Sequence, residues 1–73
     1  MTPEQKDLTN WLRDKYGATL NQEQAAEALN VHKMTLLRMR SEAVGPEWRK
    51  VRNRIIYPAG AIAAFICNVQ KTA

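Results

Sequence analysis

The chain has 73 residues and a formal net charge of +4, and 45% of its residues are hydrophobic. A chain this short forms one domain, which buries only roughly 60% of the surface exposed in the unfolded chain. No stretch reaches the ~20 apolar residues needed to span a bilayer, and residues 1–17 lack the apolar centre of a cleavable signal peptide. The single Cys excludes an internal disulfide, and with a single His it argues against a metal site. We therefore expect one domain without cofactor or metal, in a reducing cytoplasm.

The positive charge is concentrated in one part of the sequence. Residues 32–57 contain seven Lys or Arg and two Glu, a net charge of +5, whereas residues 1–31 have a net charge of −2. A basic segment of this kind is typical of a protein that binds nucleic acid or another anionic surface. The charge alone is a weak signal, and the order of the predicted elements strengthens it.

The first predicted element is a helix at about residues 3–16. Thr2 is a suitable N-cap, and Gly17 ends the helix because glycine enters the left-handed conformation without a Cβ penalty. Apolar side chains recur at helical spacing on one face, and they are Leu8, Trp11, Leu12 and Tyr16. We expect Trp11 and Tyr16 to lie in the core rather than to contact a cofactor.

Two shorter helices follow. Asn21 is the N-cap of the first, and Gln24 stands three residues later, where a capping box has Glu or Gln. Asn30 interrupts the helical pattern, and asparagine follows glycine in preference for a left-handed helix end. A new helix begins around His32 and runs to about Glu42. Two helices of roughly 8 and 11 residues, joined by a turn of three or four residues, make a helix-turn-helix.

A basic hairpin and a closing helix complete the predicted fold. Residues 48–57 alternate as in two strands, and Arg52-Asn53 is the predicted turn because asparagine tolerates positive φ. A hairpin of this length is only marginally stable alone and has to pack on the helices. Pro58 then begins a helix with one apolar face, formed by Ile62, Phe65, Ile66 and Val69. The predicted fold is mainly α: a small winged helix-turn-helix with an N-terminal helix, a two-stranded hairpin wing and a C-terminal helix.

The outer face of the second helix of the pair is the candidate DNA-binding surface. Leu36 and Met39 face the core, so the opposite face is free for a partner. Recognition helices present their first two turns to base edges in the major groove. The candidate contacts on this face are Lys33, Met34, Leu37, Arg38 and Ser41. Exposed Met34 and Leu37 argue against a merely solvated basic face, although they could instead contact a protein.

No residue pattern predicts catalysis. His32 stands at the start of the same helix, where its Nδ1 could cap the helix or its ring could contact a phosphate. No Ser, Cys or Asp constellation surrounds it in the sequence. Glu23 and Glu27 lie one turn apart, and a solvated helix face explains them better than a catalytic pair does. We therefore expect a binding protein and not an enzyme.

The hairpin supplies a second basic surface. Its candidate DNA contacts are Lys50, Arg52, Asn53 and Arg54. Arginines at a loop tip are suited to phosphates or to a narrow minor groove, where negative potential is concentrated. The alternative is an edge hairpin kept from aggregating by its charge. Gln22 and Gln24, near the N-terminus of the preceding helix, could add hydrogen bonds to phosphates.

The order and spacing of these residues resemble those of the excisionase-like, or MerR-like, winged helix-turn-helix DNA-binding proteins, which include small phage activators of the AlpA type. The resemblance covers about residues 19–67, and residues 1–17 form an additional helix outside it. It is carried by residues 20–31, Thr35-Leu36 with Arg38 and Arg40, Gly45-Pro46, Arg54, Tyr57, Ile62 and Phe65-Ile66. The spacing is more specific for the fold than for the biological role.

The resemblance implies a sequence-specific binder of double-stranded DNA, encoded by a phage or integrative element and located in the bacterial cytoplasm at the nucleoid. Family members direct a tyrosine recombinase (integrase) toward excision by bending attachment-site DNA, or they regulate a promoter. We expect an excisionase, with an AlpA-type regulator of phage or genomic-island genes as the alternative. Carried over by position, residues 52–54 form the wing, and the major-groove contacts are Lys33, Met34, Thr35, Leu37 and Arg38.

Three departures from the family pattern matter. The family usually has Ser or Thr at His32, Gly at Asn30, and acidic residues near Gly60-Ala61. The closing helix is therefore unusually apolar, which could signal a surface for a partner. The first helix could contact a second copy or an integrase.

The alternative from a different functional class is a protein-interaction module that binds no DNA. It would use residues 59–67 together with Met34 and Leu37 to contact a partner protein.

Overall fold

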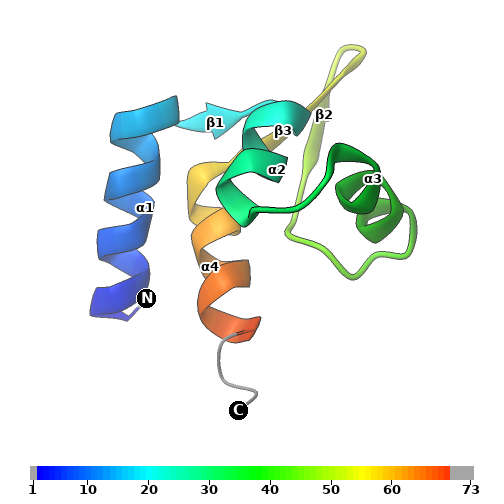
Figure 1. The fold of residues 1–73 in the computed structure, drawn as a ribbon. Helices are drawn as coiled ribbons and strands as arrows, with labels where there is room; N and C mark the ends of the chain where they lie inside the picture. Colours follow the sequence, from blue (N-terminus) through cyan, green and yellow to red (C-terminus); the bar gives the residue numbers. More distant parts are fainter. Residues whose placement is uncertain (1, 70–73) are drawn as a thin grey trace.

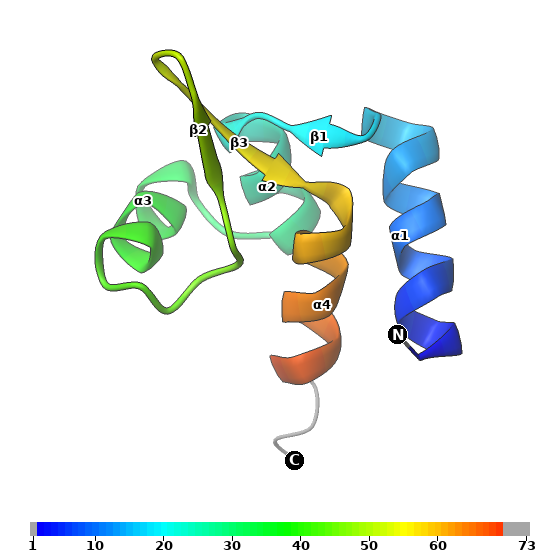
Figure 2. The ribbon, with the colours of Figure 1, turned by 180° about the vertical axis from the view of Figure 1, so that it is seen from behind.

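The computed structural model describes residues 2–69, which form four helices and a three-stranded antiparallel sheet. The elements follow in the order α1 (Pro3–Tyr16), β1 (Thr19–Leu20), α2 (Gln22–Leu29), α3 (Lys33–Ser41), β2 (Arg49–Val51), β3 (Arg54–Pro58) and α4 (Ala59–Val69). Helices α1 and α4 lie side by side, whereas α3 and the β2–β3 hairpin lie on the other side of the molecule (Figure 1 and Figure 2). This is the mainly α, winged helix-turn-helix fold that the sequence predicts.

The helix starts follow the predicted capping residues. Thr2 begins α1, because its Oγ1 accepts a hydrogen bond from the backbone N–H of Gln5 at 3.1 Å. Asn21 and Gln24 form the predicted capping box of α2, in which each side-chain oxygen accepts from the other residue's backbone N–H, at 2.8 and 3.0 Å. Gly17 ends α1 with a φ of 107°, a conformation that favours glycine. These three predictions are confirmed.

Both helices of the helix-turn-helix end in the same backbone motif. The left-handed residue is Asn30 after α2 (φ 57°), as predicted, and Ala43 after α3 (φ 58°). In each case this residue and the next donate their N–H groups to carbonyls of the last turn. The pairs are Asn30 to Glu27 at 3.1 Å, Val31 to Ala26 at 3.0 Å, Ala43 to Arg40 at 3.1 Å and Val44 to Met39 at 3.0 Å. Ala43 is strained here, because a left-handed conformation brings Cβ close to the following carbonyl oxygen.

The β2–β3 hairpin has the predicted two-residue turn. Val51 pairs with Arg54, so Arg52 and Asn53 form the loop. The positive φ of 58° belongs to Arg52, the first loop residue, and the expectation that Asn53 takes it was wrong. A two-residue loop with positive φ at its first position prefers glycine there, so the hairpin also holds a strained residue at its tip.

A third strand, β1, was not predicted. Thr19 pairs with Pro58 and Leu20 with Tyr57, which gives the sheet the strand order β1-β3-β2. The backbone N–H of Ala59 then donates to the carbonyl of residue 18 at 3.0 Å. Helix α4 therefore begins at Ala59, and Pro58 is the last residue of β3 rather than the first of the helix. Two residues are too few to show the alternation by which a strand is recognised.

The core lies between α1, α2, α4 and the β1–β3 pair, and it also receives Leu36 from α3. Its fully buried large side chains are Leu12, Leu20, Leu36, Tyr57 and Ile62. Four alanines, Ala25, Ala26, Ala59 and Ala63, complete it and allow the elements to approach closely. The Tyr57 hydroxyl is buried without a hydrogen-bond partner among residues 2–69. Such a group loses its hydration on folding, at a cost of about 1–3 kcal/mol.

Trp11 departs from the prediction, because 53% of its surface is exposed. A helix advances about 100° per residue, so Leu12 and Tyr16 share one stripe, whereas Trp11 points about 100° away from Leu12. The ammonium of Lys15 lies over the Trp11 ring, 5.1 Å from its centroid. Trp11 is therefore a surface side chain and not part of the core.

Tyr16 links α1 to α2. Its hydroxyl donates to Oε1 of Glu27 at 2.7 Å. This hydrogen bond, together with desolvation and the negative charge of the carboxylate, raises the pKa of Tyr16 above its ordinary value. With Leu12 buried against the core, the contact makes α1 an integral part of the domain.

The apolar composition of α4 is explained by packing. Ala59, Ile62 and Ala63 are fully buried, while Phe65 and Ile66 are half-buried. Val69, expected on the same face, is the last residue of α4, and its side chain lies outside the described part of the structure. In the part of the chain that the structure describes, no helix combines the length and the apolarity needed to cross a membrane.

Candidate nucleic-acid interface

Helix α3 turns one side to the core and the other to solvent. Leu36 is buried and Met39 half-buried, as the sequence predicts. The exposed side chains of the opposite face are Lys33, Met34, Leu37, Arg38 and Ser41. Thr35 is half-buried, so it is less open to a partner than its neighbours in the sequence. The predicted outer face of this helix is therefore confirmed as a free surface.

His32 caps α3. Its Nδ1 accepts a hydrogen bond from the backbone N–H of Met34 at 3.1 Å. The imidazole thus caps the helix as a Ser or Thr side chain would, because it accepts from one of the backbone N–H groups left unpaired in the first helical turn. Of the two predicted roles for His32, capping is the one that the structure contains.

Lys33 makes a surface ion pair with Glu23 of α2. Its Nζ lies 3.6 Å from the carboxylate Oε1, and both side chains are more than half exposed. Exposed pairs of this kind contribute only about 0–1 kcal/mol. A phosphate can therefore compete with Glu23 for the Lys33 ammonium, and Lys33 remains a candidate DNA contact.

The other predicted basic contacts are free of intramolecular carboxylates. Within residues 2–69 no ion pair involves Arg38, Lys50, Arg52 or Arg54. All four side chains are exposed, and so is Asn53 at the hairpin tip. Their charges are therefore available to an external anion.

The two predicted phosphate contacts of α2 are half-buried and partly occupied. Oε1 of Gln24 accepts from Asn21 in the capping box. Oε1 of Gln22 accepts from Nη1 of Arg40 at 2.7 Å. Both oxygens are thus engaged, and the amide NH₂ groups are what remain to donate to a phosphate.

Arg40 and Trp48 belong to this surface, although the sequence did not single them out as site residues. The guanidinium of Arg40 lies 5.8 Å from the Trp48 ring centroid while it also binds Gln22. Arg40 thus ties α3 to the start of α2 and to the segment before β2. Gln22 and Arg40 are 18 residues apart, so no local sequence pattern could reveal their contact.

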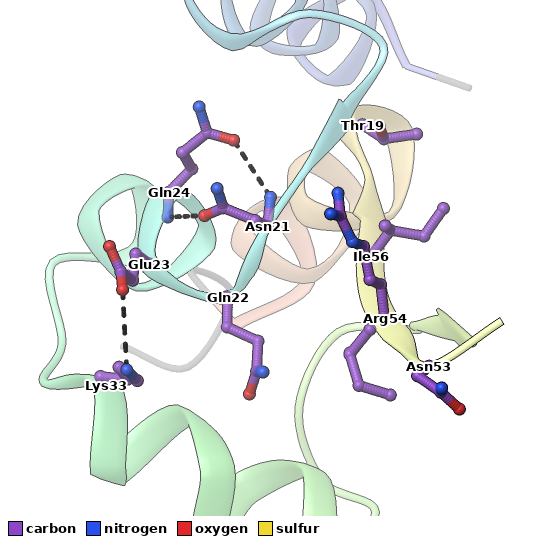
Figure 3. A pocket seen from close by; sticks show the side chains of 10 residues that line it. Thr19, Asn21, Gln22, Glu23, Gln24, Lys33, Asn53, Arg54 and Ile56 are labelled. Carbon is purple, nitrogen blue, oxygen red and sulfur yellow. Dashed lines mark hydrogen bonds and ion pairs between the residues drawn. The ribbon is translucent and has the colours of Figure 1, made fainter. Parts of the chain in front are cut away.

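An open groove of about 560 Å³ runs between the start of α2 and the wing. Figure 3 shows the labelled α2 side chains on one side of it and those of β3 and the hairpin turn on the other. Its predicted DNA contacts are Gln22, Gln24, Lys33, Asn53 and Arg54. The fold therefore brings the α2 contacts, the first residue of α3 and part of the wing to one place, whereas Lys50 and Arg52 lie outside this groove.

A second open groove, also of about 560 Å³, lies on the outer face of α3, and we call it the α3 groove. The residues that line it are Met34, Leu37, Arg38, Arg40, Ser41 and Trp48. Its walls combine exposed apolar side chains with two guanidinium groups. It shares no lining residue with the groove beside α2.

Among the described residues, no group of three His, Cys, Asp or Glu side chains is arranged to hold a metal ion. In comparisons by sequence, no protein-family model matches the chain, and no curated protein matches it.

Proposed function

We propose that this protein binds double-stranded DNA sequence-specifically and acts as an excisionase, a factor that directs an integrase toward excision of a phage or integrative element. Helix α3 would enter the major groove, and the β2–β3 turn would contact the backbone or the minor groove beside it. The observation that carries the proposal is the exposed outer face of α3 next to a basic hairpin, on the side of the molecule away from α1 and α4 (Figure 1).

The charge distribution supports this orientation. Residues 32–57 have a net charge of +5, and five of their seven basic side chains have no carboxylate partner within the described residues. Basic side chains that contact phosphates release condensed counterions, which drives association and makes it depend steeply on salt. Residues 1–31 have a net charge of −2, so the attraction to phosphates comes from residues 32–57, and Gln22 and Gln24 of α2 can add only neutral hydrogen bonds.

The small size of the domain supports cooperative binding. A single DNA-binding module buries roughly 600–1,000 Å² of its surface, which limits the affinity of one copy. Several copies on neighbouring sites would overcome that limit and bend the DNA between them. The resemblance of residues 19–67 to excisionase-like proteins favours a recombination site as the target.

The test is a titration of the full chain with random duplexes and with duplexes from the surrounding genome, at two salt concentrations. If four to six phosphates are contacted, log K falls with log salt with a slope of about −4 to −5, at about 0.9 per phosphate. Flat salt dependence, or no binding at low salt, contradicts DNA binding.

A footprint on genomic DNA then tests the excisionase role. We expect protected repeats within a recombination site, a bend in the bound duplex, and more excision product when the protein is added to its integrase. Protection of a promoter operator alone, with no effect on excision, would instead make the protein a transcriptional regulator.

A further inference from the structure

The α3 groove gathers large apolar side chains within the basic segment, residues 32–57. Met34 is 58% exposed, Leu37 38% and Trp48 39%. Met34 and Leu37 come from α3, and Trp48 comes from the segment before β2. Scattered apolar residues on a surface need no explanation, but a cluster rimmed by charged groups marks a binding site.

The groove is shaped before any ligand binds. The Arg40 guanidinium is held by its 2.7 Å hydrogen bond to Gln22 and lies over the Trp48 ring, 5.8 Å from the ring centroid. The segment that leads to Trp48 lies close to α3, because a Cβ added at Gly45 would be only 3.2 Å from the Cβ of Met39. Trp48 is thus held beside α3 by the protein itself.

The lining selects the occupant by charge and polarity. None of the six described residues that line the groove is acidic, and two of them are arginines. A ligand of this groove should therefore have an apolar group that lies beside negatively charged groups. On the base edges of the DNA major groove, the apolar group is the C5 methyl of thymine, which lies beside acceptor atoms and the phosphates.

We propose that the α3 groove reads a thymine methyl group in the major groove, with Met34, Leu37 and Trp48 in contact with the methyl. Arg38, at the border of the groove, donates to the neighbouring acceptors. This inference rests on the proposed DNA binding and names the base that the binding selects. Arg40 acts as a positioning residue, because it holds Trp48 and is itself already hydrogen-bonded to Gln22.

The test uses a duplex site selected by the full chain from random sequences. Each thymine of the site is replaced in turn by uracil, which keeps every hydrogen-bonding group and lacks only the methyl. At one or two positions we expect uracil to weaken binding about four-fold, which corresponds to about 0.8 kcal/mol for one buried methyl.

The double variant Met34→Ala/Leu37→Ala should lose this discrimination at the same positions. Both side chains are exposed on a helix, and alanine is the best helix former, so circular dichroism should show an unchanged fold. Trp11→Ala is the control, because it removes a large, 53% exposed apolar side chain from α1, outside the α3 groove. It should bind thymine and uracil duplexes as the unaltered protein does.

Three results would overturn the methyl-reading proposal but leave DNA binding intact, as judged by a steep salt dependence. The first is equal affinity for thymine and uracil at every position. The second is discrimination that persists in the Met34→Ala/Leu37→Ala variant, since it would then arise from DNA shape. The third is a variant that loses only cooperativity between copies, which would make the groove a protein contact. Absence of any binding at low salt would remove both proposals together.

Discussion

The part of the molecule built from α1, α2 and α4 and the part built from α3 and the hairpin differ in what they bury and in the charge they carry. Between residues 32 and 56, only Leu36 and Pro46 are buried. The remaining eight buried hydrophobic residues come from α1, β1, α2, the end of β3 and α4. Residues 32–57 nevertheless have a net charge of +5, against −2 for residues 1–31.

The buried apolar surface that stabilises this small domain is thus separated from the surface that we propose binds DNA. A core concentrated between α1, α2 and α4 supplies most of the buried apolar surface, which is the main favourable contribution to folding. Helix α3 is anchored by Leu36, half-buried Met39, the hydrogen bond from Arg40 to Gln22 and its two capped ends, and its outer face stays exposed. Substitutions in the two parts should therefore affect different measurements.

The largest expected effect is on stability in the first part. Leu12→Ala removes a fully buried side chain between α1 and α4, and such changes lower the free energy of unfolding by about 2–5 kcal/mol. Urea unfolding measures it. Leu37→Ala, on the exposed face of α3, is the matched control and should change stability by no more than about 0.5 kcal/mol. Similar losses for the two variants would contradict the separation.

The next effect is on binding in the second part. Arg38→Ala should weaken binding to the selected site by about 1–3 kcal/mol if the guanidinium reads a base, with little change in the unfolding curve. Arg52→Ala should weaken binding to selected and random duplexes alike, because we propose that the wing contacts the backbone. If Arg38→Ala weakens binding to the selected and the random duplex equally, Arg38 contacts a phosphate and not a base. If Arg52→Ala changes the sequence preference, the wing reads bases or DNA shape.

A gain of stability is expected at the buried hydroxyl of Tyr57. Tyr57→Phe removes a polar group that lacks a partner among residues 2–69, so the free energy of unfolding should rise by about 1 kcal/mol. DNA affinity should stay the same, because the side chain is fully buried in the core. A lower melting temperature for the variant would show that the hydroxyl is satisfied in solution.

A smaller gain is expected at the end of α3. Ala43→Gly relieves the left-handed conformation at φ 58° and should raise stability by about 0.5 kcal/mol, after subtraction of the entropy that glycine adds to the unfolded chain. Ala64→Gly, inside α4, is the opposite control and should lower stability by about 1 kcal/mol. Thermal unfolding that shows a loss for both variants would mean that Ala43 carries no strain.

The smallest effect concerns the ion pair beside α3. Glu23→Gln frees Lys33 from the carboxylate that lies 3.6 Å away, so DNA affinity at low salt should rise about two-fold, within the range of exposed ion pairs. The gain should shrink at high salt, where exposed charges are screened. Glu4→Gln, on α1, should leave affinity unchanged. An equal gain from both variants would mean that only net charge matters.

Much of the fold could be predicted because its signals are local. Thr2, Asn21 and Gln24 each make their capping hydrogen bond within three residues, and Asn30 takes the left-handed conformation that its side chain favours. Ala43 and Arg52 take the same conformation without any such preference. At Arg52 it belongs to the two-residue loop of the hairpin, and at Ala43 it accompanies the hydrogen bonds that close α3, so the residue type gives no sign of it.

The candidate site was only partly predictable for the same reason. Helical spacing was sufficient to assign the exposed face of α3. The contact of Arg40 with Gln22 and Trp48 joins segments that are distant in sequence, and it became visible only in the folded chain. Trp11 shows the opposite error, because an apolar residue at the edge of a helical stripe need not reach the core.

The most direct measurement is a titration of isotope-labelled protein with its selected duplex, followed by the backbone amide resonances. Binding through the α3 and hairpin surface predicts shifts concentrated in residues 32–41 and 50–54, with the amides of α1 and the second half of α4 unchanged. Shifts concentrated in α1 and α4, or no shifts at low salt, would contradict the account.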